Sequence, residues 1–277
     1  MRANALFHVA KRRVEVRGID LPAPAAGEVL VRSRWSAISP GTEALVFAGD
    51  FPADAALDPR IASLGGSFDY PFRYGYALVG EVAALGPGVD EALAGRTVFA
   101  FHPHQDLAIV PVDDCLPIPE GIAPEAALFL PQVETACNLV LDGGPLVGER
   151  VLVFGQGVVG LLTAALLARF PLERLVAIEP LDWRRELSAR WGVPEAVDPH
   201  DAGAWRALLD GMRGADLAFE LQAFLRVQGR EVLEQDLALA FFRRAAVDAV
   251  ELGQREVALA VLRRADLAFD RVAGAQV

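Results

Sequence analysis

A glycine-rich run in the middle of the chain has the residue types and the spacing that bind a dinucleotide. The run is Gly155, Gln156, Gly157, Val158, Val159 and Gly160. Its first glycine permits a tight turn, its second lets a pyrophosphate approach the backbone, and its third lets a helix pack close to a strand. The N–H groups at the start of that helix attract phosphates. A glycine turn that serves only helix packing is the alternative interpretation.

An acidic residue at the expected distance strengthens the nucleotide interpretation. Glu179 follows the run by roughly 20 residues, and its carboxylate would accept hydrogen bonds from the two hydroxyls of a ribose. That charge favours NAD over NADP, whose 2′-phosphate it would repel. Arg184 and Arg185 follow shortly after. They either pair with a 2′-phosphate or are solvated charges on a helix, so NAD or NADP is expected as cofactor, with NAD slightly favoured.

Strands and helices that alternate along the chain must position these groups. Apolar segments predict strands at residues 149–154, 174–178 and 216–219, and helices at residues 158–169, 182–191 and 201–212. This alternation predicts a parallel sheet with helices on its faces. A further helix is predicted over residues 124–140, with Pro131 as a kink or boundary.

The flanking regions have a different character. Up to about residue 118 the chain reads as β-rich, with strands predicted at residues 28–33, 76–84 and 97–101 and turn residues between them, as in a small barrel or sandwich. After residue 220, apolar residues four positions apart predict two amphipathic helices. The expected domains are residues 1–120, residues 121–220 and a helical tail at residues 221–277.

Composition excludes several classes of protein. The 277 residues are 53% hydrophobic, which suits a packed core, and the formal net charge is −11, which argues against a nucleic-acid binder. Cys115 and Cys137 are the only cysteines, too few for a disulfide framework or a four-thiolate zinc site, and are expected to pack as apolar residues. We expect a cytoplasmic protein without a signal peptide, a membrane span or a membrane partner.

Five segments together carry a resemblance to a known family. They are SAISPGTE at 36–43, GYALVGEVAALGPGV at 75–89, GRTVFAFHPHQDLAIVP at 95–111, VETA at 133–136 and VLVFGQGVVG at 151–160. In this order they resemble the medium-chain dehydrogenase/reductase superfamily, and most of all its zinc-lacking members grouped with bacteriochlorophyllide dehydrogenase-like proteins. The resemblance covers roughly residues 1–220. It implies an α/β fold in which a GroES-like domain precedes a Rossmann domain, shortened in this chain.

The resemblance also implies that both zinc sites of the family are missing. Zinc-dependent members carry ligands where this chain has Pro40, Tyr76 and, before the VETA turn, Pro131. Proline has no side-chain donor, and tyrosine is an uncommon zinc ligand. His102 and His104 form a His-x-His pair, but a proline separates them and no third ligand follows. No metal site is therefore expected.

Without zinc, a substrate oxygen needs a proton donor. Thr42 matches the hydroxyl that relays a proton in the family, and its alternative role is to cap a turn. The Tyr76 phenol either donates to a developing alkoxide or fills space, and His104 either positions the substrate or is an ordinary loop histidine. Glu43 either orients the local backbone or is a surface acid. In the family Thr135 lies near the nicotinamide end of the cofactor, where it would hold a phosphate or the carboxamide, unless it caps the helix.

These observations predict a zinc-independent NAD(P)-dependent oxidoreductase that transfers a hydride to or from a small alcohol, carbonyl or enone. The segments that complete the nucleotide domain in the family are not found after Glu220. A relative that binds nucleotide without turnover is therefore an alternative, as is an interaction protein that uses its tail helices. These helices would cover the sheet edge or pair in a homodimer, unless the tail arose by deletion or frameshift.

Overall fold

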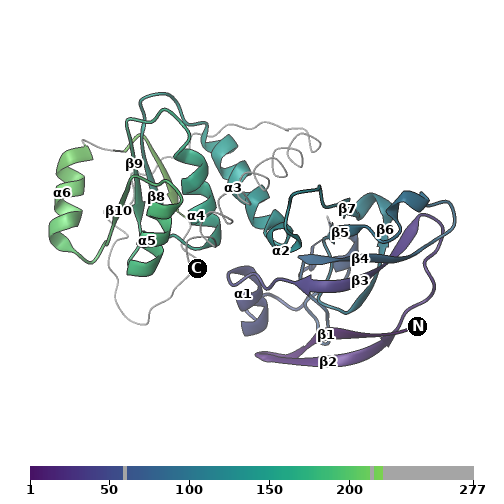
Figure 1. Ribbon diagram of the computed structural model, residues 1–277. Coiled ribbons are helices and arrows are strands. Elements are labelled where there is room, and N and C mark those ends of the chain that lie inside the picture. The colour runs from purple at the N-terminus through teal and green to yellow at the C-terminus, as the bar shows by residue number, and fades with distance from the viewer. Residues whose placement is uncertain (59–60, 213–214, 221–277) are drawn as a thin grey trace, which may run out of the picture. The chain divides into compact units, whose positions relative to one another are not determined.

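The structure is a computed structural model that describes residues 1–58, 61–212 and 215–220 (Figure 1). The predicted helical tail at residues 221–277 lies outside this part of the chain. The described residues form two compact units, the first from Met1 to Pro131 and the second from Gln132 onward. Within the described part, no helix is both long enough and apolar enough to cross a membrane.

A five-stranded antiparallel sheet is the centre of the first unit. Its order is β6-β3-β4-β5-β7. The strands are β3 (Glu28–Ser36), β4 (Leu78–Leu85), β5 (Thr97–Ala100), β6 (Leu107–Pro111) and β7 (Leu116–Pro117). The three strands predicted in this region are confirmed. Alternate side chains of β3, β4, β5 and β6 meet in one apolar core that also holds Cys115.

A two-stranded hairpin precedes this sheet and was not predicted. It pairs β1 (Arg2–Ala10) with β2 (Arg13–Asp20) in antiparallel register. Six of the eight residues of β2 are exposed, Val14 and Val16 among them, so the alternation of charged and apolar residues in this strand marks no buried face. Backbone bonds tie the hairpin to the rest of the unit, because the His8 N–H donates to Phe72 (2.8 Å) and the Leu6 N–H donates to His104 (3.0 Å).

Short helices complete the first unit. Helix α1 (Thr42–Ala48) ends at Gly49, whose φ of 72° is the left-handed conformation that glycine adopts most easily. The 3₁₀ turns are η1 (Ala62–Leu64), η2 (Glu91–Leu93) and η3 (Val112–Asp114). Val46 of α1 packs into an aromatic cluster with Phe68, Phe72 and Tyr74. This contact fixes the helix against the unit.

Two helices take the place of the single one predicted over residues 124–140. Helix α2 (Pro124–Ala127) ends before Leu128, and α3 (Leu130–Gly143) begins two residues later. The break therefore precedes Pro131, which is the second residue of α3. Proline is tolerated in a first helical turn because the N–H that it lacks has no partner within the helix there.

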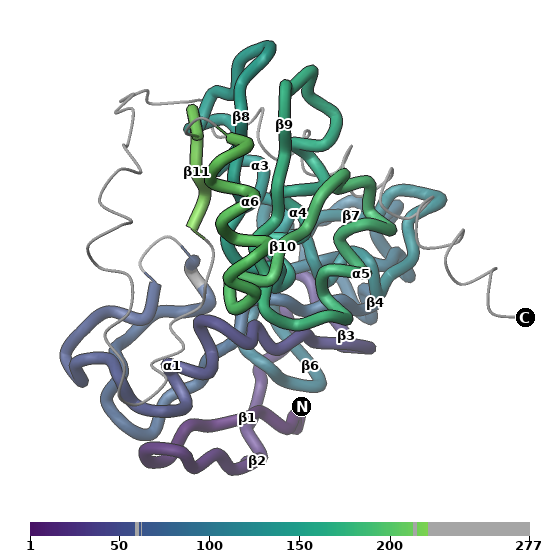
Figure 2. The backbone as a smooth tube through the Cα atoms, turned by 90° about the vertical axis from the view of Figure 1, so that its left-hand side faces the viewer, coloured from purple at the N-terminus to yellow at the C-terminus, as the bar shows by residue number. Residues whose placement is uncertain are grey.

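The second unit contains a parallel sheet whose order is β10-β9-β8-β11 (Figure 2). The strands are β8 (Arg150–Phe154), β9 (Arg174–Ile178), β10 (Glu195–Val197) and β11 (Leu217–Glu220). The helices are α4 (Val158–Leu167), α5 (Asp182–Arg190) and α6 (Ala202–Met212). All the predicted helices and strands of this region are confirmed. Strand β10, with only three residues, was not predicted.

Both faces of this sheet are buried. Leu175 and Ala177 of β9 pack into one apolar cluster, and Val176 and Ile178 of the same strand pack into another with helix α6. A strand covered on both sides needs apolar residues at every position, which is why β9 has a continuous apolar run. Burial of each Leu, Val or Ile side chain among them contributes about 1.5–3 kcal/mol.

Strand order places the glycine run. The chain passes from the central strand β8 outward to β9 and β10, and then returns to the other side of β8 as β11. The direction of travel reverses at β8, and ligands of open α/β sheets bind at the carboxyl ends of the strands where this reversal occurs. The glycine run immediately follows β8 and therefore lies at this end.

Candidate functional site

The glycine run forms a sharp turn between β8 and α4. Gly155 has a φ of 83°, and its N–H donates to the Ile178 carbonyl at the end of β9 (2.8 Å). Gly157 caps helix α4 and has no side chain to occupy the N–H groups of the first turn. These N–H groups belong to a ten-residue helix, whose positive dipole end attracts an anion.

The space around the glycines matches the roles predicted for them. A Cβ on Gly160 would lie 1.9 Å from the Gly155 carbonyl oxygen, so α4 approaches β8 only because no side chain is present. A Cβ on Gly157 would meet nothing within 4 Å, so the surface is open at the second glycine. An open second glycine beside free helical N–H groups fits a pyrophosphate.

Glu179 is buried behind the turn, with only 2% of its surface exposed. Its Oε2 accepts from the Gln156 N–H (2.7 Å), and its Oε1 accepts from the Leu181 N–H (3.0 Å). The carboxylate thus joins the glycine run to the loop after β9, a role that the sequence did not reveal. Each carboxylate oxygen can accept a second hydrogen bond, so ribose binding remains compatible with this geometry.

Gln156 also stabilises the turn. Its side-chain amide donates to the Gly155 carbonyl (3.0 Å) and accepts from the Ser188 hydroxyl of α5 (2.9 Å). The side chain is buried, so Gln156 presents its backbone to a ligand. The turn is therefore fixed from β9 and from α5 before any ligand binds.

The two arginines of α5 differ in what they contact. Arg185 donates to the Glu179 carbonyl (2.7 Å) and pairs with Asp182, so it is part of the scaffold. Arg184 lies 3.6 Å from Glu179 Oε2, and its guanidinium stacks over Trp183, 5.1 Å from the ring centroid. Of the pair, Arg184 is therefore the one suited to meet a phosphate.

Thr135 lies inside α3, beyond its first turn, and is exposed. The helix-capping alternative is wrong for this residue, because α3 begins at Leu130 and a cap must precede the first turn. Its predicted contact with a phosphate or carboxamide remains a prediction.

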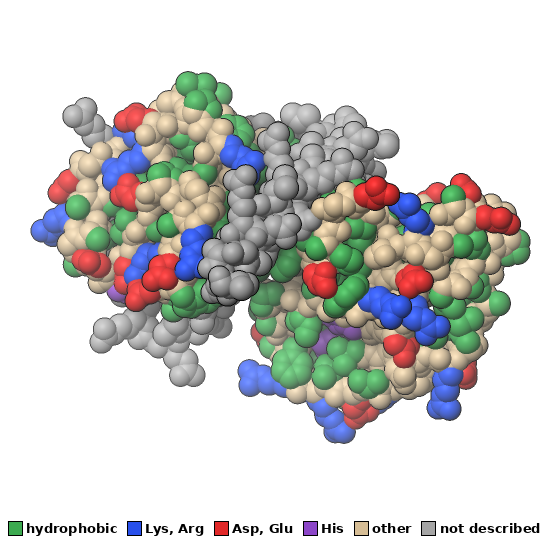
Figure 3. Space-filling view, viewed as in Figure 1, with side chains coloured by type: hydrophobic (Ala, Val, Ile, Leu, Met, Phe, Trp, Pro, Cys, Tyr) green, Lys and Arg blue, Asp and Glu red, His purple; other side chains and the backbone are tan. Residues whose placement is uncertain are grey.

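A hydrogen-bonded chain of three side chains lies in the first unit. His104 Nε2 is 2.7 Å from Glu43 Oε2, and His104 Nδ1 is 2.7 Å from Ser36 Oγ. His104 and Glu43 are buried, whereas Ser36 is exposed. Histidine surface is visible among hydrophobic side chains on this unit (Figure 3). Both ring nitrogens of His104 therefore have a side-chain partner, and its role toward a substrate stays a prediction.

Several elements hold the three side chains in place. Ser36 ends β3, and Glu43 lies in the first turn of α1, where its Oε1 accepts from the Ser39 N–H (2.8 Å) and its own N–H donates back to Ser39 (3.0 Å). The His104 ring packs over Gly75, where a Cβ would come within 2.6 Å of it. The backbone-orienting role predicted for Glu43 is confirmed, and the surface-acid alternative is wrong.

Ser36 was not among the predicted site residues. It is far from His104 in the sequence, and only the folding of β3 beside the segment after β5 brings the two together. A serine at the end of a strand carries no local signal of a histidine partner. Of the residues that the structure describes, Ser36 and Glu43 are the ones hydrogen-bonded to the His104 ring, rather than Thr42 or Tyr76.

Thr42 and Tyr76 occupy different surroundings. Thr42 is exposed at the start of α1, whose cap Gly41 makes no side-chain capping bond. Tyr76 is half-buried, and its ring packs edge-on against Tyr74 with centroids 6.2 Å apart. The space-filling role of Tyr76 is therefore real. Whether either hydroxyl meets a substrate stays a prediction.

Two further histidines flank His104 without forming a metal centre with it. Burial lowers the pKa of His102 to about 4, and its Nδ1 lies 3.1 Å from the Pro103 carbonyl. His8 stacks on Phe72 with centroids 5.0 Å apart, and burial also lowers its pKa. Within the described part of the chain, no group of three His, Cys, Asp or Glu side chains is arranged to hold a metal ion.

Both cysteines behave as the packing residues that were predicted. Cys115 and Cys137 are buried, and burial raises the pKa of each thiol, that of Cys115 to about 12. A thiol in that state is a poor nucleophile and a poor metal ligand.

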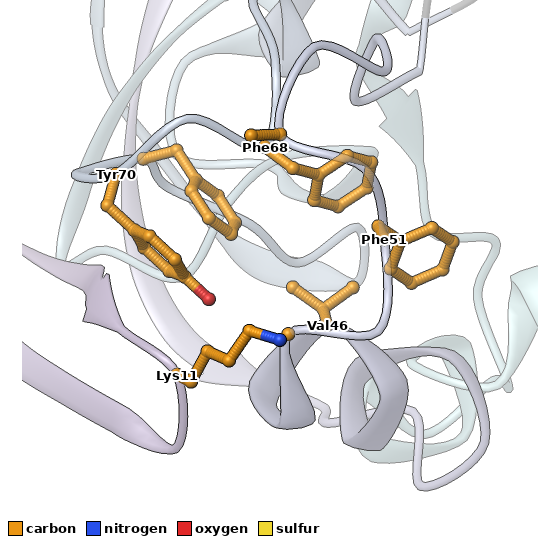
Figure 4. A pocket seen from close by; sticks show the side chains of 8 residues that line it. Lys11, Val46, Phe51, Phe68 and Tyr70 are labelled. Atoms are coloured by element: carbon orange, nitrogen blue, oxygen red, sulfur yellow. The ribbon is translucent and has the colours of Figure 1, made fainter.

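A pocket of about 210 Å³ lies beside helix α1 (Figure 4). It is lined by Lys11, Val46, Gly49, Phe51, Ala53, Phe68, Tyr70 and Phe72. The Tyr70 hydroxyl points toward the Lys11 side chain (Figure 4). No residue predicted to act in the site lines this pocket, so it is separate from the chain of Ser36, His104 and Glu43.

No family model matches the chain. A relative, L-threonine 3-dehydrogenase of Pyrococcus horikoshii, is 26% identical over 80% of this chain and 68% of its own length. Among solved structures, an alcohol dehydrogenase from Escherichia coli CFT073 in complex with NADH has a TM-score of 0.65 at 19% identity, covering 79% of this chain and 69% of that one.

A candidate zinc-binding dehydrogenase from Sinorhizobium meliloti 1021, solved with NADP, has a TM-score of 0.70 at 18% identity and covers 96% of this chain and 90% of its own. These relatives and structural neighbours are medium-chain dehydrogenases and reductases. The chain has their α/β fold, a β-rich GroES-like domain followed by a Rossmann domain with a parallel sheet.

Proposed function

We propose that this protein is a zinc-independent, NAD(P)-dependent oxidoreductase that interconverts a small alcohol with its carbonyl compound or reduces an enone. The observation that carries the proposal is the glycine turn at the carboxyl end of β8, where the strand order reverses. Its dehydrogenase relatives support the same activity class. A bound nicotinamide would supply the hydride donor or acceptor, and the protein supplies orientation and proton transfer.

The residues around the turn suit such a cofactor. The pyrophosphate would lie over Gly157 against the N–H groups at the start of α4, including those of Val158 and Val159. Glu179 would bind the ribose with its remaining acceptor capacity. Thr135 is a candidate contact toward the nicotinamide end. The open surface at Gly157 leaves room for the pyrophosphate.

Zinc does not fit the residues present. The positions at which zinc-dependent members carry ligands hold Pro40, Tyr76 and Pro131 here, and proline offers no donor atom. We therefore derive no step through zinc, and we assign proton transfer to side chains. His104 is the candidate with a built hydrogen-bond environment, and Thr42 and Tyr76 are candidates for direct contact with the substrate oxygen.

The preference between NAD and NADP depends on two neighbouring charges. Glu179 would repel a 2′-phosphate, whereas Arg184 beside it would attract one. Because Glu179 lies closest to the turn and is fixed there by two backbone bonds, we propose that NAD is preferred.

Titration of the full-length protein with NADH and with NADPH by calorimetry tests the proposal, followed by a panel of alcohols, sugars, quinones and enones. We expect binding below millimolar concentration and tighter binding of NADH. Failure of both nucleotides to bind would refute the function. One equivalent of tightly bound zinc in the purified protein would refute zinc independence.

A second candidate is a protein that binds the nucleotide without turnover. It is favoured by the absence, after Glu220, of the sequence segments that complete the nucleotide domain in the family. Binding without activity on any member of the panel would support it. We also propose that the protein forms a homodimer, which size-exclusion chromatography with light scattering tests. A cytoplasmic location is a further part of the proposal.

A further inference from the structure

We propose that Ser36, His104 and Glu43 form a proton relay whose outer end, the Ser36 hydroxyl, contacts the substrate oxygen. The inference rests on the proposed function for its substrate class, an alcohol or carbonyl compound. Its geometric basis lies wholly within the first unit. Two hydrogen bonds of 2.7 Å connect three side chains that come from β3, the segment after β5 and helix α1.

The donor and the acceptor of each hydrogen bond in the relay follow from the chemistry of the three side chains. An ionised carboxylate only accepts, so the hydrogen between Glu43 and His104 is carried by Nε2 of the ring. In a neutral imidazole the other nitrogen then has a lone pair, so Nδ1 accepts the Ser36 hydroxyl proton. Glu43 thereby fixes the tautomer in which His104 acts as a base toward Ser36.

The relay can work in both directions of the proposed reaction. During oxidation, the substrate hydroxyl gives its proton to Ser36 Oγ while Ser36 gives its own proton to His104 Nδ1. The substrate O–H and the Ser36 O–H break, and a new O–H on Ser36 and an N–H on His104 form. A bound oxidised nicotinamide would accept the carbon-bound hydrogen as a hydride, which would leave the carbonyl compound. During reduction the same protons move outward.

Burial determines which group meets the substrate. Glu43 and His104 are 6% and 7% exposed, whereas Ser36 is exposed. The imidazolium formed during oxidation stays beside the Glu43 carboxylate, and a charge pair of this kind is stronger inside a protein than in water. Protons therefore enter and leave the proposed relay through the Ser36 hydroxyl.

The ring is also prevented from turning. Gly75 lies against the His104 ring so closely that no side chain is possible there, and the backbone N–H of His104 donates to the Tyr74 carbonyl (3.3 Å), which fixes the main chain that carries the ring. The second oxygen of Glu43 is occupied by the Ser39 N–H. Such fixed orientation is what a proton-transfer group needs in order to avoid reorganisation during the reaction.

Nuclear magnetic resonance of the full-length, ¹⁵N-labelled protein tests the relay directly. The chain has four histidines, and long-range ¹H–¹⁵N correlations distinguish their tautomers. The His104 signals are assigned by their loss in His104→Gln. In the wild type we expect His104 to be in the Nε2–H tautomer. In Glu43→Gln we expect this single tautomer to be lost. In Ser36→Ala we expect the Nδ1 signal to shift to that of a nitrogen without a hydrogen bond.

Steady-state kinetics, with a substrate on which the panel shows activity, supply the second measurement. We expect Ser36→Ala to lower kcat at least tenfold with little change in KM, and Ser36→Thr to recover most of the activity because it keeps the hydroxyl. Ser33→Ala is the matched control, since Ser33 lies on the same strand and its hydroxyl donates to the Trp35 carbonyl (3.4 Å) rather than to His104. It should leave kcat unchanged.

The outcomes separate the relay from the proposed function. An Nδ1–H tautomer of His104, or a Ser36→Ala variant with unchanged kcat, overturns the relay even if both nucleotides bind. Failure of NADH and NADPH to bind overturns the proposed function, while the tautomer experiment still decides whether Ser36, His104 and Glu43 are connected as described. Loss of activity in Ser36→Ala with the control unaffected supports both.

Discussion

Glu179 illustrates how one buried acid serves the fold beside a candidate ligand site. Its two oxygens accept backbone N–H groups from the glycine turn and from the loop after β9. Hydrogen bonds to a charged acceptor contribute more than neutral ones, and a buried group that loses its partner is costly. The acid is therefore needed for the shape of the turn before it is needed for a ribose.

Replacing Glu179 by glutamine tests this role. The amide N–H₂ would face one of the two backbone donors, so one pair is lost, and we expect the free energy of unfolding to fall by about 1–3 kcal/mol. Urea unfolding followed by tryptophan fluorescence measures the change. The control Glu186→Gln, at an exposed position of α5, should have little effect. Equal stability of Glu179→Gln and the wild type would contradict the assignment.

Arg184 permits a selective test of cofactor preference. Its guanidinium lies beside Glu179 and over Trp183, in position to meet a 2′-phosphate. We expect Arg184→Ala to weaken NADPH binding about tenfold, the equivalent of about 1.4 kcal/mol, and to change NADH binding little. Calorimetric titration with both nucleotides measures this. An equal loss for the two nucleotides would assign Arg184 to the scaffold.

His102 makes stability depend on pH. Burial lowers its pKa from 6.5 to about 4, so the folded state binds fewer protons than the unfolded state between these values. The contribution of neutral His102 to the free energy of unfolding is therefore complete above pH 6.5 and is lost as the pH falls toward 4. A shift of this size corresponds to about 3 kcal/mol. His8 shifts in the same direction, with burial again the largest cause.

Urea unfolding at pH 7 and at pH 4.5 checks the prediction. We expect His102→Gln to show a smaller loss of stability on acidification than the wild type, because glutamine has no proton to gain. His200→Gln is the matched control, since His200 is exposed. The prediction is wrong if the His102 and His200 variants have the same pH dependence.

At the scale of elements, the strand–turn–helix unit of β8 and α4 depends on two glycines for different reasons. Gly160 lets the helix approach the strand, because any Cβ would collide with the Gly155 carbonyl. Gly157 leaves an open surface above the helix N-terminus. Gly160 thus serves the fold, whereas we propose that Gly157 serves the ligand.

Alanine at each position separates these roles. We expect Gly160→Ala to destabilise the protein by several kcal/mol, since backbone must move, whereas Gly157→Ala should fold normally and bind NADH at least tenfold more weakly. Thermal unfolding and calorimetry measure the two effects. Normal NADH binding by Gly157→Ala would show that the nucleotide does not approach the second glycine.

At the scale of the whole molecule, ligand binding and stability are linked. A nucleotide that binds only the folded protein stabilises it by about 2.7 kcal/mol at one hundred times its Kd. We therefore expect NADH to raise the Tm in a concentration-dependent way, and AMP to raise it less because it lacks the nicotinamide half. An unchanged Tm at millimolar NADH would argue against a nucleotide site in the folded protein.

The sequence by itself determined the alternation of strands and helices in the second unit and the glycine turn. These depend on local apolar periodicity and on glycine spacing, which neighbouring residues already contain. It also indicated His104, through its place in a segment shared with a family. The hairpin β1–β2 was not predicted, and the alternating valines of its second strand are exposed rather than packed in a core.

Only the tertiary structure decided which side chains meet. Glu179 holds the glycine turn because β9 pairs beside β8, and Ser36 reaches His104 because β3 and the segment after β5 lie in one unit. Hydrogen bonds between residues far apart in sequence leave no local pattern, since they depend on strand order and burial. The residues of the turn were thus evident from the chain, whereas the partners that fix its shape and complete the proposed relay were not.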